Sequence, residues 1–361
     1  MKKIFCVFFL CAISAPALSK NLRIPIDPAP AGHSQYNRSE RGGVCTGSDF
    51  TVVVSSRGWV LKVDHQGKVI WREKSVCSPS IGPVADQQKI FYACDNGQMI
   101  AVDLEQGKLA WKFEFQDSVA SKPALSAENI FFVTGDGRAF ALNKNDGSIR
   151  WVQRLAGRYG LSLRAAGQPL LTPNALYLGL GDGTVAAIDP ENGDLIWKKR
   201  IFEQSIQSAV SFPMLFDANG VYPSSRQGVC ALSTTSSMLF WCLNEELAIE
   251  PVQYQNSIYA LNTTNGLLKI DKIAGIVDQR IQLKKSRWRE KFEYQKPLLI
   301  FTIGPELRVL FTDKIMKIDP KTGKGRKMKT FRKPIERGLF SGGKLYLLSS
   351  SGYLEIITLS E

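Results

Sequence analysis

The stretch AVDLEQGKLAW at residues 101–111 decides the fold of this chain, because its pattern of Ala, Asp, Gly and Trp recurs at regular intervals. Residues 187–197 repeat the pattern as AIDPENGDLIW, and residues 141–151 repeat it with Asn143 in place of the aspartate. The tryptophans of five such units are spaced 40, 40, 46 and 44 residues apart and are Trp71, Trp111, Trp151, Trp197 and Trp241. A glycine stands four residues before the tryptophan in every unit except the fifth, which has Ser237 there. A period of this kind is typical of repeat architectures.

Each unit also carries the signals of short antiparallel strands. In the second unit, the apolar run at 90–92 is followed by an Asn-Gly turn at 96–97 and a second apolar run at 99–102. Asp-Gly pairs occupy the equivalent position at 136–137 and 182–183. Such pairs favour tight hairpins, since these turns need positive φ angles. A repeat of about 40 residues with several short strands is typical of propeller blades.

The first of the five tryptophan units begins at residues 51–54. Three weaker units without the tryptophan follow the fifth, which gives eight units in all. We therefore predict an all-β fold, an eight-bladed β-propeller of four-stranded antiparallel blades. The last unit ends at Glu361, just past its third strand, so a strand within residues 21–50 is expected to complete the eighth blade and close the ring. Seven blades is the alternative if the unit near Asp319 has degenerated.

The five tryptophans are expected to have a structural role. Each one lies on the predicted outermost strand of its blade, where it docks against the neighbouring blade, because a single sheet cannot bury both of its faces. Burial of an indole removes about 150–250 Å² from water, which contributes roughly 4–6 kcal/mol at the upper limit. We interpret these side chains as core rather than as a sugar-binding platform.

The N-terminus has the pattern of a secretory signal, with two lysines, an apolar run at 4–13 and small residues before position 20. We predict a signal peptide at 1–19, an N-terminal segment at 20–44 that contributes the closing strand, and a single propeller domain at 45–361. Cys11 follows Leu10 rather than a small residue, so we interpret it as part of the apolar run and expect no lipid anchor. No later run reaches the length that spans a bilayer.

Five cysteines remain after the predicted cleavage, namely Cys45, Cys77, Cys94, Cys230 and Cys242. Their spacing matches no zinc pattern. Cys230 and Cys242 flank one predicted hairpin, so they either form a disulfide in an oxidising compartment or, in the interpretation we favour, lie unpaired as small buried side chains.

The chain is strongly basic, with 46 basic and 33 acidic residues and a net charge of +13. This balance favours acidic partners, and the predicted export makes nucleic acid the least suitable of them. Two basic stretches stand out at 284–296, where Trp288, Phe292 and Tyr294 are interleaved, and at 321–337. They form either a contact surface for an acidic partner or lipid head groups, or solvated loops between blades.

The sequence offers little for catalysis. Its two histidines, His33 and His65, lie in polar segments without an evident partner, so they form neither a metal site nor a general-base pair. The Gly-Asp-Gly triplets at 135–137 and 181–183 recur at one position of the repeat, which indicates hairpin geometry rather than an ion site. We therefore expect no catalytic residue, no metal and no cofactor.

The repeat resembles the tryptophan-docking repeat of the pyrroloquinoline-quinone propellers. Eight such blades on a short exported chain resemble the BamB family, the propeller subunits of the outer-membrane β-barrel assembly machinery. The resemblance implies a non-enzymatic periplasmic scaffold on the inner face of the outer membrane, a monomer within a complex. Such a scaffold binds BamA through its POTRA domains, assists the insertion of outer-membrane proteins and contacts their unfolded strands.

A more specific similarity lies in the segment Leu161-Ser162-Leu163-Arg164, which precedes Pro169. It is similar to a segment of the BamB family that contacts the POTRA region, which implies that Leu161, Leu163 and Arg164 bind the partner. Two leucines and an arginine also match the usual composition of binding hot spots.

The chain departs from the family in two places: Ala165 replaces a glycine, and the stretch 208–213 lacks an acidic pair. Two other functions stay open. One is a propeller that binds polysaccharide or anionic lipid head groups. The other is a relative of the quinoprotein dehydrogenases, although these enzymes carry adjacent cysteines and this chain has none.

Overall fold

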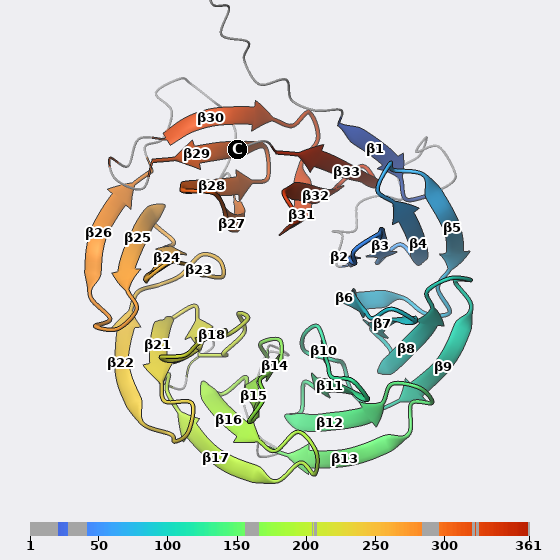
Figure 1. The fold of residues 1–361 in the computed structure, drawn as a ribbon, viewed down its shortest axis with the longest axis horizontal. Helices are drawn as coiled ribbons and strands as arrows, with labels where there is room; N and C mark the ends of the chain where they lie inside the picture. The colour runs from blue at the N-terminus through green and yellow to red at the C-terminus, as the bar shows by residue number, and fades with distance from the viewer. Residues whose placement is uncertain are drawn as a thin grey trace, which may run out of the picture.

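Each repeat unit forms one antiparallel β-sheet in the computed structural model, and the eight sheets stand side by side in a ring (Figure 1). The predicted eight-bladed all-β propeller is therefore confirmed, and the alternative with seven blades is wrong. The structure describes residues 21–27, 42–155, 166–203, 205, 208–283, 296–319, 322 and 325–359. Outside these ranges lie the predicted signal peptide with Cys11, His33, Leu161, Leu163, Arg164, Ala165 and most of the basic stretch 284–296.

In seven blades the strands run in chain order from the centre of the ring to its rim, and in the eighth the outermost strand comes from the N-terminus (Figure 1). Blades are numbered along the chain. Blade 1 consists of β2 (Gly43–Thr46), β3 (Phe50–Ser55), β4 (Trp59–Asp64) and β5 (Val69–Lys74), and blade 2 of β6 (Pro79–Ala85), β7 (Lys89–Cys94), β8 (Gln98–Asp103) and β9 (Leu109–Glu114). Blade 3 consists of β10 (Ala124–Leu125), β11 (Asn129–Val133), β12 (Arg138–Asn143) and β13 (Ile149–Arg154), and blade 4 of β14 (Leu170–Leu171), β15 (Leu176–Gly179), β16 (Thr184–Ile188) and β17 (Leu195–Arg200).

Blade 5 consists of β18 (Leu215–Asp217), β19 (Gly220–Tyr222), β20 (Ser224–Ser225), β21 (Gly228–Leu232) and β22 (Leu239–Asn244), and blade 6 of β23 (Val252–Tyr254), β24 (Ser257–Leu261), β25 (Gly266–Asp271) and β26 (Val277–Gln282). Blade 7 consists of β27 (Pro297–Ile303), β28 (Glu306–Phe311), β29 (Lys314–Ile318) and β30 (Gly325–Thr330), and blade 8 of β31 (Ile335–Ser341), β32 (Lys344–Ser349), β33 (Tyr353–Thr358) and β1 (Leu22–Pro25).

Blade 5 departs from the four-stranded pattern because its second strand is divided at Pro223. The two pieces, β19 and β20, both pair with β21. Proline has no N–H to donate to the ladder, although its carbonyl still accepts a hydrogen bond from Cys230 N at 3.0 Å. The blade therefore keeps the arrangement of the others with one interrupted strand.

The ring is closed by the N-terminal strand β1, which pairs with the C-terminal strand β33. Leu22 lies opposite Ile356 and Ile24 opposite Leu354, so the two ends of the described chain share the eighth blade. Ile24 and the following Ile26 are buried with apolar residues of blade 1. The prediction that a strand within residues 21–50 completes the last blade is confirmed.

The apolar core is divided among the seams between blades, and one cluster of buried side chains fills each of the eight seams. Successive residues of a strand point to opposite faces, so Ile90 packs toward blade 1 and Phe91 toward blade 3. Both faces of the second strand are therefore buried, which explains the continuous apolar runs in the sequence.

The recurring Asp, Gly and Trp positions meet at these seams. Between blades 2 and 3, Asn143 Oδ1 accepts a hydrogen bond from the backbone of Asn145 at 2.8 Å and holds the turn before β13. Gly147 ends that turn with a φ of +77°, and a Cβ placed on it would lie 2.7 Å from the indole of Trp111. Trp111 Nε1 donates to the carbonyl of Lys144 at 2.8 Å. The glycine thus leaves the space in which the preceding blade's indole lies.

The same contact recurs at three further seams. Trp71 lies on Gly107, Trp151 on Gly193 and Trp241 on Gly275. The indole N–H groups of these tryptophans donate to the backbone carbonyls of Leu104, Pro190 and Lys272, respectively. Between blades 4 and 5, Ser237 stands at the glycine position of the repeat. There the hydroxyl of Tyr177, whose ring contacts Trp197 in the same blade, donates to the equivalent carbonyl of Thr234 at 2.6 Å. At the closing seam, Leu22 occupies the space over Gly67.

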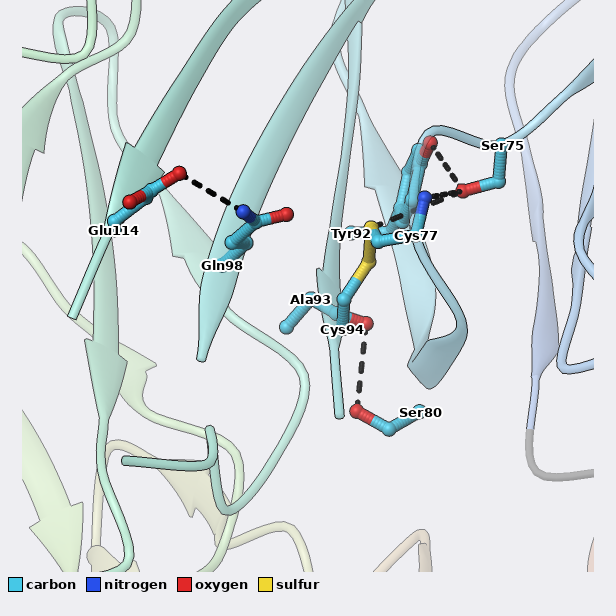
Figure 2. Close-up of a disulfide and its surroundings, with 8 residues drawn as sticks. All are labelled: Ser75, Cys77, Ser80, Tyr92, Ala93, Cys94, Gln98 and Glu114. Atoms are coloured by element: carbon cyan, nitrogen blue, oxygen red, sulfur yellow. Dashed lines mark hydrogen bonds between the residues drawn. A yellow bond between two sulfur atoms is a disulfide. The ribbon is translucent and has the colours of Figure 1, made fainter. Parts of the chain in front are cut away.

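Two disulfides reinforce the blades. Cys230 and Cys242 lie opposite each other on β21 and β22 and are bonded, so our preference for two unpaired side chains is wrong. Directly opposed residues on adjacent antiparallel strands are close enough for a disulfide. The second bond, between Cys77 and Cys94, was not predicted and joins the connection before blade 2 to the end of β7 (Figure 2).

The contact between Trp111 and Gly147 can be tested by substituting two glycines that both have positive φ. Gly147→Ala is expected to combine a backbone penalty of about 1–2 kcal/mol with a steric penalty of about 1–3 kcal/mol from the contact with Trp111. Gly304→Ala should show the backbone penalty alone, because nothing lies within 4 Å of its added Cβ. Urea denaturation measures both free energies of unfolding, and equal losses would contradict the role of Gly147.

Candidate partner-binding surface

The connections between blades gather on one face of the ring. Each blade has its strands antiparallel and in sequence, so the link from a fourth strand to the next blade lies on the same side as the turn between the second and third strands. We call this side the connection face. Leu161, Leu163 and Arg164 belong to the link between β13 and β14, and although they lie outside the described residues, both ends of the link, Leu155 and Ala166, are buried.

The described part of this link rests on its neighbours. Ser121 Oγ, from the link before blade 3, donates to Gly167 O at 2.9 Å. An added Cβ on Gly167 would lie 2.7 Å from Phe212 O and 2.8 Å from Val210 O, in the link before blade 5. Three consecutive links therefore pack side by side on the connection face, and the absence of a side chain at Gly167 permits their close approach.

The first half of the stretch 208–213, which lacks the family's acidic pair, packs toward the core. Ser208 and Val210 are fully buried, and Ala209 is nearly so. Val210 N donates to Leu180 O at 3.0 Å, and the Ser208 hydroxyl donates to Ser205 O at 2.8 Å. These residues anchor the link to blade 4 and present no carboxylate.

Charged side chains from distant parts of the sequence lie within electrostatic range near the first strands of the blades. Lys122 Nζ donates to Val44 O of blade 1 at 3.5 Å, and its side chain passes over Gly82 of blade 2, where an added Cβ would lie 3.0 Å from Lys122 Cε. Glu250, from the link before blade 6, and Arg337, on β31, both interact electrostatically with Lys122. We call Lys122, Glu250 and Arg337 the central charge cluster.

Burial shifts the ionisation of two members of this cluster. Desolvation lowers the pKa of Lys122, and the positive charge of Arg337 lowers it further, while Cys45 and Glu250 oppose the shift. Desolvation also raises the pKa of Glu250, against the opposing charges of Lys122 and Arg337. Two charges held partly out of water are costly for a fold unless they are satisfied by partners.

The described residues offer little nucleophilic or metal-binding chemistry. Burial raises the pKa of the Cys45 thiol to about 12, so this free cysteine stays protonated at neutral pH and is a poor nucleophile. His65 is exposed in a turn. No group of three or more potential metal ligands occurs in the ranges that the structure describes. Within the same ranges, no helix has the length and apolar character needed to cross a membrane.

The five repeat tryptophans are not brought together into one site. They lie on β5, β9, β13, β17 and β22, the outermost strands of five different blades, around the rim of the ring (Figure 1). The central charge cluster, by contrast, was missed at the level of the sequence. Its one signal is a charged residue directly before a proline that begins a blade, as in Lys122-Pro123 and Glu250-Pro251.

The desolvation of Glu250 predicts that the stability of the fold depends on pH. Because its pKa is higher in the folded protein than the usual 4.5, the associated stability is present below that value and is lost as the pH rises through the folded pKa. Glu250→Gln is therefore expected to raise the melting temperature relative to wild type near neutral pH, with the gain shrinking below about pH 4.5. Glu128→Gln removes an exposed carboxylate as the control, and a gain that is independent of pH would contradict this assignment.

Comparisons with known proteins agree with this architecture. The family model described as outer membrane protein assembly factor BamB matches residues 56–280. The crystal structure of BamB from Moraxella catarrhalis is similar to this chain with a TM-score of 0.77 and 16% identity, over 94% of this chain and 98% of that one. A computationally designed protein, Ika8, is similar with a TM-score of 0.70 and 11% identity, over 93% and 100% of the two chains.

No curated protein sequence matches the chain. At these identities the two solved structures establish the propeller fold alone. The family model, however, spans more than half of the chain and covers the units that carry all five docking tryptophans. This chain therefore belongs to the family of the outer membrane protein assembly factor BamB.

Proposed function

We propose that the protein is a non-enzymatic periplasmic scaffold of the outer-membrane β-barrel assembly machinery, which binds BamA and assists the insertion of outer-membrane proteins. The observation that carries this proposal is the family match over residues 56–280, in a chain whose eight blades close into a complete ring. The same family supports a location in the periplasm at the inner face of the outer membrane, as one copy within a larger complex.

Leu161, Leu163 and Arg164 are the proposed contact with the POTRA region of BamA. The supporting geometry is that their link belongs to the connection face, and that its described base is fixed by Ser121 and Gly167. A loop on a rigid base loses less conformational entropy on binding than a free loop does. The leucines would supply apolar anchors and the arginine a planar set of donors.

The stretch 208–213 does not take part in this proposal, because its first three residues are used inside the fold and it carries no acidic residue. Ser208, Ala209 and Val210 are buried, and no acidic residue stands among them. The interface of this chain would therefore depend more heavily on the link before blade 4 than on the link before blade 5.

The outermost strands are the proposed contact for unfolded outer-membrane strands. Each outermost strand has one edge without a pairing partner in its sheet, and an extended peptide can add to such an edge. Ile196 on β17 and Phe240 on β22 are about half exposed, at 50% and 47%, and offer apolar contacts beside these edges. Strand addition needs only backbone groups and alternating side-chain contacts, which suits clients of varied sequence.

The interface can be tested with Leu163→Ala combined with Arg164→Ala. This double variant is expected to weaken binding to BamA at least about 100-fold, because hot-spot side chains of these types carry most of the energy of an interface. Co-purification and titration of the two purified proteins measure the effect, and the melting temperature should stay unchanged.

The matched control removes an arginine and an apolar residue from an exposed part of the described chain. Arg150→Ala with Val152→Ala changes the outermost strand β13, at the rim and next to the same link. This variant should bind BamA as the wild type does. Wild-type binding by the Leu163/Arg164 variant would remove the proposed interface, and equal losses in both variants would show a general rather than local effect.

A further inference from the structure

Most of the net charge of the protein comes from the C-terminal part of its sequence. Residues 21–283, which supply blades 1–6 together with β1, contain 25 basic and 25 acidic side chains. Residues 284–359, which supply blade 7 and most of blade 8, contain 18 basic and seven acidic side chains. A basic excess spread evenly over a surface would serve solubility, whereas this one creates a local positive field.

The outermost strand of blade 7 lies in this sector. On β30, Arg326 and Lys327 are exposed and Lys329 is half-buried. Lys327 follows Asp319 by eight residues, the same spacing that separates Trp111 from Asp103 in blade 2. The position that holds a docking tryptophan in five blades thus holds an exposed lysine in blade 7.

The positive surface continues onto blade 8. Lys329 lies within electrostatic range of Glu355 on β33, and Arg23 on β1 pairs with the same carboxylate at 3.8 Å. β30 and β1 are therefore neighbours on the rim, as Figure 1 also shows. Lys333 is exposed in the link that follows β30. We call Arg23, Arg326, Lys327, Lys329 and Lys333 the basic rim.

The acidic side chains of this sector are largely engaged elsewhere. Glu306 pairs with the buried Arg308 at 2.8 Å and with Lys317. Glu355 is the carboxylate shared between Arg23 and Lys329. Within the described ranges, no carboxylate forms an ion pair with Arg326, Lys327 or Lys333, so the basic rim keeps a net positive charge.

We propose that the basic rim docks the propeller edge-on against a bilayer surface of anionic phospholipids. The rim is the convex outer edge of the ring, and its charges stand on long flexible side chains, which suits a diffuse layer of head groups. Met328, 39% exposed between the lysines, adds an apolar contact for the interfacial region.

This proposal does not depend on binding to BamA, since the basic rim and the link before blade 4 lie in different sectors of the ring. It predicts that the protein co-sediments with vesicles of phosphatidylethanolamine and phosphatidylglycerol, and that salt weakens the binding steeply. The variant Arg326→Gln, Lys327→Gln, Lys329→Gln should bind these vesicles roughly 100-fold more weakly. Each basic residue near an anionic surface strengthens binding by a similar factor of about five, and the variant loses three of them.

The control neutralises Lys198, Lys199 and Arg200, the same three charges on the outermost strand of blade 4. It should retain wild-type binding, as should the Leu163/Arg164 variant. A second variant neutralises Lys333 together with the neighbouring Arg332, both exposed in the link after β30. This variant, Arg332→Gln with Lys333→Gln, should also bind more weakly and leaves β30 intact if the triple variant is unstable. The proposal is overturned by equal losses in the blade 4 control, by equally strong binding to phosphatidylcholine vesicles, or by absence of wild-type binding at low salt.

Discussion

The ring depends on the contact between an indole and the next blade. A four-stranded sheet with two apolar faces is not stable alone, so every blade must be covered on both sides. At four seams, a tryptophan on the rim lies on a glycine with positive φ and donates to a carbonyl of the same turn. The aspartate or asparagine of the repeat shapes that turn. One motif of eleven residues thus fixes the outer part of each of these four seams.

At two seams that lack the indole contact, another side chain takes its place. Between blades 4 and 5 a tyrosine hydroxyl reaches the equivalent carbonyl, and at the closing seam Leu22 covers Gly67. The closing seam also gains hydrogen bonds from Arg57 to Ser350 O at 2.7 Å and from Arg72 to Pro25 O at 2.6 Å. Pairing of β1 with β33 then ties the two ends of the chain into one sheet, so the ring opens only if that sheet is broken.

A rigid ring separates three surfaces that differ in chemistry. The connection face carries the described base of the link before blade 4, to which the proposed BamA contact belongs. The rim of blades 4 and 5 carries exposed apolar side chains beside strand edges, and the rim of blades 7 and 8 carries an excess of basic side chains. The proposed contacts with a partner, a client and a lipid surface therefore lie on separate parts of the ring, namely one face, the rim of blades 4 and 5, and the rim of blades 7 and 8.

The sequence by itself determined the repeat, the eight blades, the closing strand and the tryptophan positions, because each rests on local periodicity and turn chemistry. It also showed the excess of basic residues near the C-terminus, although not that β30 and Arg23 share one rim. Only the tertiary structure decided which cysteines pair, and it brought Lys122, Glu250 and Arg337 together from three separate blades. These contacts join residues far apart in the chain, and their geometry follows from closure of the ring, which no local pattern encodes.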